Sequence, residues 1–504
     1  MKKILSIEEL TKKINILKKR NKKIVLCHGV FDLLHIGHLN HFKSAKKFGD
    51  ILIVSITDDF FVNKGPGRPV FNSQQRSEII ESIKFVDFVI VNKNKVASNI
   101  IKQIKPHIYC KGLDYKAVSK DFTLQIKDEM RVAKQYNCLV KFTSDKLYSS
   151  SEILNSSNLV HSEVQALFIR NLKKKFTFEY ISRLINSVKK KILVIGEIII
   201  DEYVFTKALG KSGKESVLTF QNLKKEKFLG GSGAIANHLA DFCNKISIYG
   251  MVGDTKNNIN FIKTKIKKNV NLMLFKKFNS PTIVKRKYLD HDGRKVFSTY
   301  HINDDLVDGK QNLQIKNFLK KNIKKYDLII VSDYGHGFLS DDTSKLITRE
   351  SKFLAVNCQI NSSNSNFHSL HKYKNFDLLI INEAELRNEF KDRSSNLEEL
   401  VKKLSKDYFI KKCIVTRGSQ GALLYDYKSK HFISCPAFAS KIVDKVGAGD
   451  AMLSVAALLL SNHLPDDLVL MLSSLAAAQS VENLSNSKSI NKINLLKHMS
   501  HLLK

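Results

Sequence analysis

The chain has 504 residues, of which 43% are hydrophobic and 26% charged, a composition typical of globular domains of about 150 residues each. No apolar stretch reaches the ~18 residues that a membrane span needs, and seven scattered cysteines without a CxxC pair argue against a disulfide framework or a zinc site. The net charge of +35 comes mostly from lysines spread along the chain, which favours a solvated surface and anionic metabolites over a nucleic-acid partner. We expect a soluble, cytoplasmic, multidomain protein with no nucleic-acid or membrane partner.

Apolar runs alternate with helical stretches over the first 155 residues. A helix is expected at residues 6–20, where Ser6 and Glu9 have the spacing of a capping box. A second helix is expected near residues 38–48. Strands are expected at residues 23–27, 51–57 and 88–91. Strands separated by 10–15 helical residues are typical of βαβ units, so we expect an α/β domain with a doubly wound parallel sheet.

A polar, basic segment at residues 156–190 interrupts this pattern, and its periodicity near residues 176–188 predicts a connecting helix. A second, longer α/β pattern fills residues 191–504. Its strands are expected at residues 192–199, 246–250, 328–331, 353–356, 378–381 and 412–416. The β-prone stretches between residues 217 and 300 predict a small accessory sheet that acts as a lid. We therefore expect domains at residues 1–155 and 191–504, joined by a helical linker.

Two histidines stand where the first strand passes into a helix, in the segment CHGVFDLLHIGH at residues 27–38. Open α/β sheets bind ligands at this edge. His35 and His38 share one face of the first helical turn, and Gly37 lets a phosphate approach the backbone. The helix N-terminus adds N–H donors and partial positive charge. Two imidazoles aimed at one phosphate would stabilise the charge that builds up on it during displacement.

This segment resembles the HxGH nucleotidyltransferases of the cytidylyltransferase-like superfamily. Further motifs over residues 20–155 agree with the resemblance, namely NKGPGRP at 63–69, QRSE at 75–78, YCKGLDY at 109–115 and YSSS at 148–151. The resemblance implies a Rossmann-like fold and attack by a sugar phosphate on the α-phosphorus of a nucleoside triphosphate, with Mg²⁺ and release of pyrophosphate. His35 and His38 would then be catalytic. Nucleotide and phosphate contacts would come from His28, Gly29, Phe31, Lys64, Arg68, Arg76, Lys111, Asp114, Ser149, Ser150 and Ser151.

A second set of small residues stands near the C-terminus, in the segment DKVGAGD at residues 444–450. Small residues before a helix leave its first backbone N–H groups free to form an anion hole. A carboxylate at Asp450, just inside that helix, is placed to take a proton from a hydroxyl that attacks a phosphoryl group. The segment therefore predicts a phosphoryl-transfer site.

This segment resembles the D-x-x-G-A-G-D signature of ribokinase-like, PfkB-type sugar kinases, and the resemblance covers residues 190–490. It implies ATP and Mg²⁺, with Asp450 as the catalytic base, and adds a monovalent cation as a candidate ion at the kinase site. The nucleotide and anion hole would involve Asn382, Glu385, Thr416, Gly418, Gly421, Gly447, Ala448 and Gly449, with Glu385 also a metal ligand. The sugar would be bound by Asp201, Gly230, Gly231 and Asn237, although Asn237 lies at an unusual spacing.

Together the two domain types resemble the family of bifunctional heptose-7-phosphate kinase and heptose-1-phosphate adenylyltransferase enzymes, with the domains in swapped order. The resemblance implies phosphorylation of a sugar phosphate at its anomeric hydroxyl, then adenylyl transfer to the sugar 1-phosphate. A phosphatase would act between the two steps, and the product would be ADP-heptose for lipopolysaccharide. The alternative keeps both chemistries but uses CTP and a kinase for another sugar or polyol. The sequence leaves open the assembly, a homodimer included, and any passage of intermediates between the sites.

Two departures from the family pattern affect the predicted sugar site. His336 stands where the motif D-Y-x-K-G has its lysine, and the strand end that reads D-P-K-like in the family is VNCQ at residues 356–359. These changes replace charged groups with amides and an imidazole. The cluster formed by Asn357, Gln359, Asn361 and Asn364 either binds substrate or is a polar loop.

Overall fold

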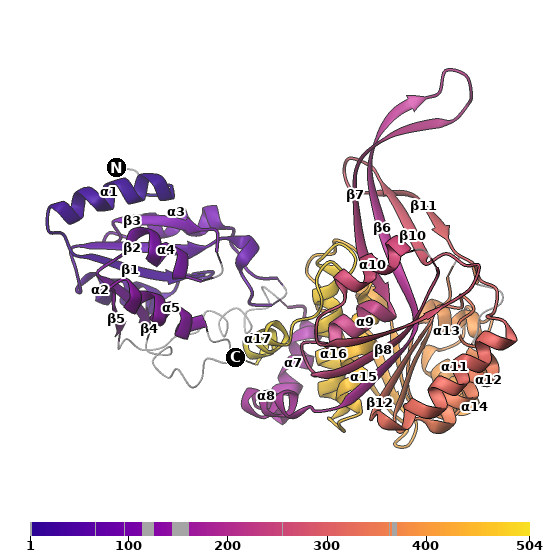
Figure 1. The fold of residues 1–504 in the computed structure, drawn as a ribbon. Coiled ribbons are helices and arrows are strands. Elements are labelled where there is room, and N and C mark those ends of the chain that lie inside the picture. The colour runs from indigo at the N-terminus through magenta and orange to yellow at the C-terminus, as the bar shows by residue number, and fades with distance from the viewer. Residues whose placement is uncertain are drawn as a thin grey trace. The chain divides into compact units, whose positions relative to one another are not determined.

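The computed structural model describes residues 3–65, 67–94, 96–112, 125–143, 161–254, 256–361, 363–364 and 370–503. The chain divides into two compact units, Met1–Ala166 with Leu496–Lys504, and Leu167–Leu495. Each unit contains its own sheet (Figure 1). In the described part of the chain, every helix is too short or too polar to cross a membrane.

The N-terminal unit is built on a five-stranded sheet with the order β3-β2-β1-β4-β5, and all its strand pairs are parallel. The strands are β1 (Ile24–Gly29), β2 (Ile51–Thr57), β3 (Phe88–Asn92), β4 (Ile108–Gly112) and β5 (Leu139–Thr143). The helices are α1 (Ile7–Lys19), α2 (Ile36–Lys46), α3 (Ser73–Glu81), α4 (Ser98–Ile104) and α5 (Gln125–Gln135), with a 3₁₀ turn η1 (Asp59–Phe61). The predicted parallel sheet is confirmed, and so is the capping box of α1, in which Ser6 and Glu9 each accept from the other's backbone N–H.

Side chains of β1 alternate between two apolar clusters, as the two-residue period of a strand requires. Ile24 and Leu26 belong to a cluster with Leu10 of α1, whereas Val25 and Cys27 belong to another with Phe42 of α2. The strand order reverses between β1 and β4. In an open α/β sheet, this reversal places a crevice at the carboxyl ends of those two strands. The segment with the two predicted catalytic histidines follows β1 directly.

The C-terminal unit contains one sheet of twelve strands among the described residues. They are β6 (Lys191–Lys211), β7 (Leu218–Gly231), β8 (Lys245–Val252), β9 (Val270–Lys276), β10 (Ile283–Leu289), β11 (Lys295–His301), β12 (Leu328–Asp333), β13 (Leu354–Cys358), β14 (Phe376–Asn382), β15 (Ile410–Thr416), β16 (Ala422–Asp426) and β17 (His431–Cys435). The predicted strands are all found, most of them longer by one to a few residues. The strands β15, β16 and β17 pair antiparallel, as do β6 with β7 and β10 with β11, so the predicted parallel sheet is extended by antiparallel strands and the whole sheet is mixed.

Strand β6 joins the main sheet to the predicted accessory sheet. Its first half pairs in parallel with β8 and β12, and its second half pairs antiparallel with β7 and in parallel with β10. The accessory strands therefore continue the main sheet through one 21-residue strand. Figure 1 shows the β6–β7 hairpin extending well beyond the main sheet.

Helices cover both faces of this sheet. One group consists of α9 (Ser232–Leu239), α15 (Ala448–Leu460) and α16 (Asp466–Val481), in which α15 packs against both of the others. Another group contributes side chains to the apolar core on β12–β15 and consists of α11 (Gly309–Asn322), α12 (Asp341–Glu350) and α14 (Leu397–Tyr408). The remaining elements are α7 (Glu163–Lys175), α8 (Phe178–Ser187), α10 (Lys256–Lys265), α13 (Glu383–Glu389) and α17 (Lys492–Leu502), with 3₁₀ turns η4 (Ile323–Lys325), η5 (Leu370–Lys372) and η6 (Gly418–Gln420). The predicted helix near residues 176–188 corresponds to α8.

Candidate active sites

The predicted transferase site begins at the carboxyl end of β1. His28 is buried there, and its Nδ1 lies 3.0 Å from Ser55 Oγ on β2. Gly29 is packed so closely that a Cβ atom would lie 2.8 Å from the Phe31 ring. The Phe31 ring in turn meets His38 edge to face, with 5.4 Å between ring centroids. The glycine and the phenylalanine thus fix the turn that presents the histidines.

His35 and His38 lie together at the start of α2, as predicted. His35 is the N-cap residue, and its Nδ1 accepts a hydrogen bond of 3.1 Å from Gly37 N–H. The two imidazole rings stack with 4.0 Å between centroids and an interplanar angle of 28°. Nδ1 of His38 is buried and has no hydrogen-bond partner among the described residues. A buried polar atom of this kind is normally satisfied by a ligand or water.

His28 and His38 are neutral at pH 7 in the ligand-free chain. Burial lowers the pKa of His38 to about 3, and electrostatic interactions with His35, Lys64 and His41 add to the effect. Burial lowers the pKa of His28 to about 4, and burial followed by the charge of Lys64 lowers the pKa of His35. The structure thus brings Lys64 into the electrostatic surroundings of the histidine pair. An anion bound here would favour the protonated imidazoles.

Asp32 anchors the loop that carries Lys64 and Arg68. Its Oδ1 accepts from Val70 N at 2.7 Å and from Phe71 N at 3.2 Å. Its Oδ2 lies 3.5 Å from Nη1 of Arg68, and both side chains are almost completely buried. The basic loop is therefore held next to the turn after β1.

Lys111, a predicted phosphate contact, lies behind His28. Its Nζ is 3.2 Å from Glu129 Oε2 and 3.5 Å from the His28 carbonyl oxygen. Glu129 also accepts from Ala97 N and from the Tyr109 hydroxyl. Lys111 is therefore part of a buried ion pair that supports the histidine. Four other predicted contacts, Asp114, Ser149, Ser150 and Ser151, lie outside the described residues.

Arg76 has a different role from the predicted phosphate contact. Its side chain is fully buried. The guanidinium donates to the carbonyl oxygens of Phe71, Val30 and Thr57 and to the Asp59 carboxylate. These four bonds join α3 to the ends of β1 and β2, so we correct its role to positioning the loops around the site.

We predict that Arg76→Met destabilises the N-terminal unit by about 3–5 kcal/mol, because three carbonyl groups around the fully buried guanidinium, and the partly exposed Asp59 carboxylate, lose their donor. Urea unfolding that follows this unit measures the loss. The matched control is Arg131→Met, since Arg131 forms an exposed pair with Asp128 and should change stability by less than about 0.5 kcal/mol. Equal effects of the two substitutions would contradict the positioning role.

The predicted anion hole lies at the start of α15. Gly447 is the N-cap residue with φ 89°, and a Cβ atom there would lie 2.2 Å from Asn486 Oδ1. Within the described residues no side chain caps this helix end. The backbone N–H groups of the first turn, which includes Ala448 and Gly449, therefore stay available to an anion.

Asp450 stands in the first turn of α15 and is held by Tyr334, whose hydroxyl donates to Asp450 Oδ1 at 2.9 Å. Burial raises the pKa of Asp450 to about 7, and the charge of Asp201 adds to the rise, whereas Tyr334 and Lys285 oppose it. A carboxylate with a pKa near 7 is matched to general-base chemistry at neutral pH. The sequence pattern predicted no role for Tyr334, which follows β12, or for Lys285 of β10, because both are distant in sequence from Asp450.

A buried carboxylate fixes the strand end that carries Tyr334. Glu197 accepts from Tyr334 N at 3.0 Å and from His336 N at 3.2 Å. Burial and the neighbouring charge of Asp333 raise the pKa of Glu197 to about 7. Side-chain amides of Asn361 and Asn364 also donate to the Tyr334 carbonyl oxygen, at 2.9 and 2.7 Å.

The asparagine cluster has the character of a polar loop. Besides the two amides that bind Tyr334, the Asn357 amide donates to the Ile380 carbonyl oxygen at 2.9 Å. The backbone N–H of Gln359 donates to the Asp333 carbonyl oxygen. These groups are used to hold backbone, which favours the structural alternative over a substrate contact.

His336 is fully buried, with Nδ1 2.6 Å from Asp304 Oδ1. The ammonium group beside this strand end comes from Lys277, whose Nζ binds the carbonyl oxygens of Asn303, Asp305 and His336. The replacement of the family's lysine by a histidine therefore leaves a cation nearby, contributed by another part of the chain.

The predicted sugar-binding residues come together only in part. Asp201 Oδ1 lies 2.7 Å from Lys287 Nζ, and a Cβ atom at Gly230 would lie 2.5 Å from Asp201 Oδ2. Gly231, with φ 59°, follows directly and begins α9. The predicted sugar-binding role of Asn237 is corrected. Its side-chain amide donates to the Lys265 carbonyl oxygen and accepts from the Lys267 backbone N–H, so it joins α9 to the segment around residues 265–267.

The predicted nucleotide residues lie at the carboxyl ends of β14 and β15, where Asn382 and Thr416 are register partners. Gly418 opens η6, and Gly421 ends it in a left-handed conformation, with a would-be Cβ 2.0 Å from Cys435 O. Asn382 and Glu385 form the capping box of α13. The N-x-x-E motif is therefore also a local structural device.

Glu385 fits direct metal ligation poorly. Its Oε2 accepts from Asn382 N at 3.0 Å and its Oε1 from Ile360 N at 3.2 Å. The side chain is buried, and burial raises the pKa of Glu385 to about 7. A carboxylate engaged by two backbone N–H groups suits a role beyond the first ligands of Mg²⁺, which normally keeps several waters and binds the substrate's phosphates.

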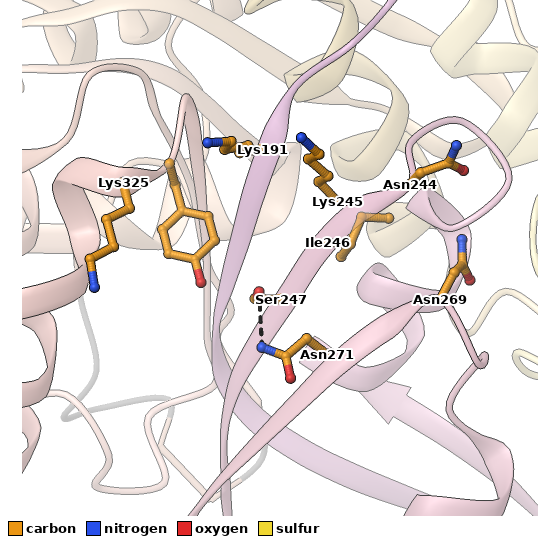
Figure 2. Close-up of a pocket in the computed structure, with 9 residues that line it drawn as sticks. Lys191, Asn244, Lys245, Ile246, Ser247, Asn269, Asn271 and Lys325 are labelled. Carbon is orange, nitrogen blue, oxygen red and sulfur yellow. Dashed lines mark hydrogen bonds between the residues drawn. The ribbon is translucent and has the colours of Figure 1, made fainter.

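A separate pocket lies at the opposite end of the same sheet. It is lined by Lys191 of β6, Lys245–Ser247 of β8 and Asn271 of β9, with Lys325 nearby (Figure 2). Figure 2 shows the hydrogen bond of 3.4 Å between Asn271 Nδ2 and Ser247 Oγ. Most of these residues begin their strands, whereas Asp333, Asn382 and Thr416 end theirs. We therefore assign the kinase chemistry to the carboxyl ends and not to this pocket.

The two sites define an enzyme with a nucleotidyl-transfer domain and a sugar-kinase domain on two α/β units. The model of the pfkB family of carbohydrate kinases matches residues 189–493, and the cytidylyltransferase-like model matches residues 26–156. The chain belongs to the pfkB family of carbohydrate kinases and also carries a cytidylyltransferase-like nucleotidyltransferase domain.

Curated relatives carry the name bifunctional protein HldE. One from Campylobacter fetus subsp. fetus is 37% identical over 131 residues, which cover 25% of this chain and 28% of the relative. One from Campylobacter jejuni is 28% identical over 317 residues, or 62% of this chain and 66% of the relative. Each match thus spans less than two thirds of the relative's length. Phosphofructokinase-2 from Escherichia coli, solved in complex with potassium, shares the fold, with a TM-score of 0.50 and 14% identity over 62% of this chain and 100% of that one.

Proposed function

We propose that this chain makes ADP-heptose in the cytoplasm by two reactions. Residues 191–504 would phosphorylate heptose 7-phosphate at its anomeric hydroxyl, and residues 1–155 would transfer an adenylyl group from ATP to the heptose 1-phosphate, with residues 156–190 as linker. The observation that carries the proposal is one chain with both a kinase-type base, Asp450, at a helix N-terminus that no described side chain caps, and a stacked His35–His38 pair. The HldE relatives support the choice of sugar.

In the proposed kinase step, Asp450 takes the proton of the anomeric hydroxyl as the hydroxyl oxygen attacks the γ-phosphorus of ATP. The N–H groups at Gly447, Ala448 and Gly449 would stabilise the charge that develops on the transferred phosphoryl group. Tyr334 orients Asp450 through its hydroxyl. Asp201 would hold sugar hydroxyls, with Lys287 Nζ 2.7 Å from its Oδ1 keeping the carboxylate in place.

In the proposed transferase step, an oxygen of the sugar 1-phosphate attacks the α-phosphorus of ATP and pyrophosphate leaves. His35 and His38 would donate N–H groups to the oxygens on which charge accumulates. Lys64 and Arg68 would attract the triphosphate to the loop. Positioning and charge stabilisation account for most of the catalysis in phosphoryl chemistry of this kind, so no covalent intermediate is needed.

Kinases of the pfkB family use ATP and Mg²⁺. We propose that Mg²⁺ enters with the nucleotide's phosphates and that Glu385 orders water around it, since backbone N–H groups already engage both carboxylate oxygens. When bound, the ion neutralises phosphate charge. A monovalent cation at the kinase site is a further proposal, supported by the potassium complex of the structural neighbour.

The experiment that tests this function uses the purified full chain with Mg²⁺. With ATP and D-glycero-D-manno-heptose 7-phosphate we expect ADP release, and with heptose 1-phosphate we expect pyrophosphate release from ATP in preference to CTP. These products are read by coupled assays. A preference for CTP would contradict ADP-heptose as product, and turnover of neither sugar would contradict heptose as substrate.

We predict reciprocal losses in two variants. Asp450→Asn should lower the kinase rate by about 10²–10⁴-fold, because the attacking hydroxyl loses its base, while adenylyl transfer stays near normal. His38→Ala should lower adenylyl transfer by about 10²–10³-fold and leave the kinase unchanged. Steady-state rates of both reactions measure the effects, with circular dichroism to show that each variant is folded. Loss of both activities in one folded variant would contradict two separate sites.

We predict that kinase kcat/KM falls about tenfold per pH unit below pH 7. The carboxyl pKa of Asp450 in the free chain is about 7, so protonation removes the base as pH decreases, and the rate reaches a plateau above pH 7. Glu385 also has a pKa of about 7, which makes Glu385→Gln the matched control. That variant should be slower but should show the same fall in kcat/KM below pH 7. If the fall disappeared in Glu385→Gln, the titrating group would be Glu385 and not Asp450.

A further inference from the structure

Two cysteines and a histidine converge below the turn that carries the HxGH histidines. Cys27 of β1 and Cys110 of β4 are register partners on neighbouring parallel strands, and both belong to the apolar cluster that includes Phe42 of α2. His41 precedes Phe42 on the same helix. One ligand atom from each of the three residues lies within 4.8 Å of the other two.

We propose that Cys27, Cys110 and His41 form a binding site for a soft divalent metal ion, Zn²⁺, in the N-terminal unit. Tetrahedral zinc binds thiolate sulfur at about 2.3 Å and imidazole nitrogen at about 2.0–2.1 Å, which separates the ligand atoms by about 3.5–3.8 Å. Side-chain rotations that shorten the distances between the three ligand atoms by about 1 Å are therefore enough to bind the ion. Three protein donors leave one position for water.

The donor set matches this ion in charge and softness. Thiolate and imidazole ligands select zinc over Mg²⁺, which prefers oxygen. Two thiolates and one Zn²⁺ sum to zero charge, and the imidazole binds in its neutral form. A neutral cluster costs far less to bury among apolar side chains than a lone thiolate. Both cysteines are completely buried, and His41 is half-buried.

Binding exchanges protons for metal. Burial, followed by interaction with Cys110, raises the pKa of Cys27 well above its usual value, so its thiol is protonated without metal. A cysteine binds zinc as its thiolate, so an S–H proton passes to solvent as the S–Zn bond forms, and no electrons are transferred. The Thr143 hydroxyl, 2.9 Å from Nδ1 of His41, orients the imidazole as an outer-shell partner.

The bound ion would link three elements around the transferase site. Cys27 immediately precedes His28, Cys110 precedes Lys111, and His41 lies one turn after His38 on α2. An ion that binds the folded but not the unfolded unit stabilises it by mass action. The site thus fixes the helix that presents the catalytic pair without touching substrate.

The test is a titration of the reduced, chelator-treated full chain with Co²⁺ alone. We expect one equivalent to produce a thiolate-to-cobalt charge-transfer band with the intense visible bands of tetrahedral coordination. Zn²⁺ should displace the cobalt and abolish these bands. Cys27→Ser and Cys110→Ser should each weaken binding by more than the 10–100-fold typical of an outer-shell change.

The matched control is Cys138→Ser, because Cys138 is buried in the other apolar cluster of the same unit. It should bind cobalt as the unchanged chain does. A missing charge-transfer band, or a band that persists in Cys27→Ser, would overturn the proposal. So would a Cys27–Cys110 disulfide found by peptide mass spectrometry in a chain kept under reductant. The band of the unchanged chain needs no variant and remains a test even where a serine variant fails to fold.

Discussion

Parallel strand pairing is the constraint on which both sites depend. Parallel strands end at one edge of a sheet, and residues distant in sequence therefore meet there. In the N-terminal unit the edge gathers His28 of β1 and Lys111 of β4. In the C-terminal unit it gathers Asp333 of β12, Asn382 of β14 and Thr416 of β15. The proposed metal site uses the residues one position before His28 and Lys111, since strand register pairs Cys27 with Cys110.

Several motif residues hold backbone instead of facing a ligand, and this separates structural from chemical roles within one motif. Arg76 donates four hydrogen bonds to protein groups, and Glu385 completes a capping box. Asn361 and Asn364 donate to the Tyr334 carbonyl oxygen and so fix the backbone of the residue whose hydroxyl binds Asp450. A buried polar group must find a partner, so such residues are as constrained as the catalytic ones.

The pattern of neighbouring residues predicted the secondary-structure elements and the motifs, but it did not predict the contacts between residues that are distant in sequence. The strand runs, the α1 capping box and the stacked His35–His38 pair all depend on residues close in sequence, and all are confirmed. The continuation of β6 into the accessory strands was missed, because its second half leaves the fully buried apolar run for a more polar one. The contact of Asp450 with Tyr334 joins a helix to the residue after β12, and Cys27 meets Cys110 through strand register. Spacing along the sequence encodes neither.

The two sites use charge in opposite ways, which suits their proposed reactions. Burial lowers the pKa of His38 and the neighbouring groups lower it further, so this imidazole is neutral until a polyanion arrives. Burial raises the pKa of Asp450 and the charge of Asp201 adds to the rise, so the carboxylate is a stronger base than an exposed aspartate. Lys285 limits that rise. One site is therefore tuned to bind a developing anion and the other to remove a proton, because burial favours the neutral form of an imidazole and of a carboxyl group alike.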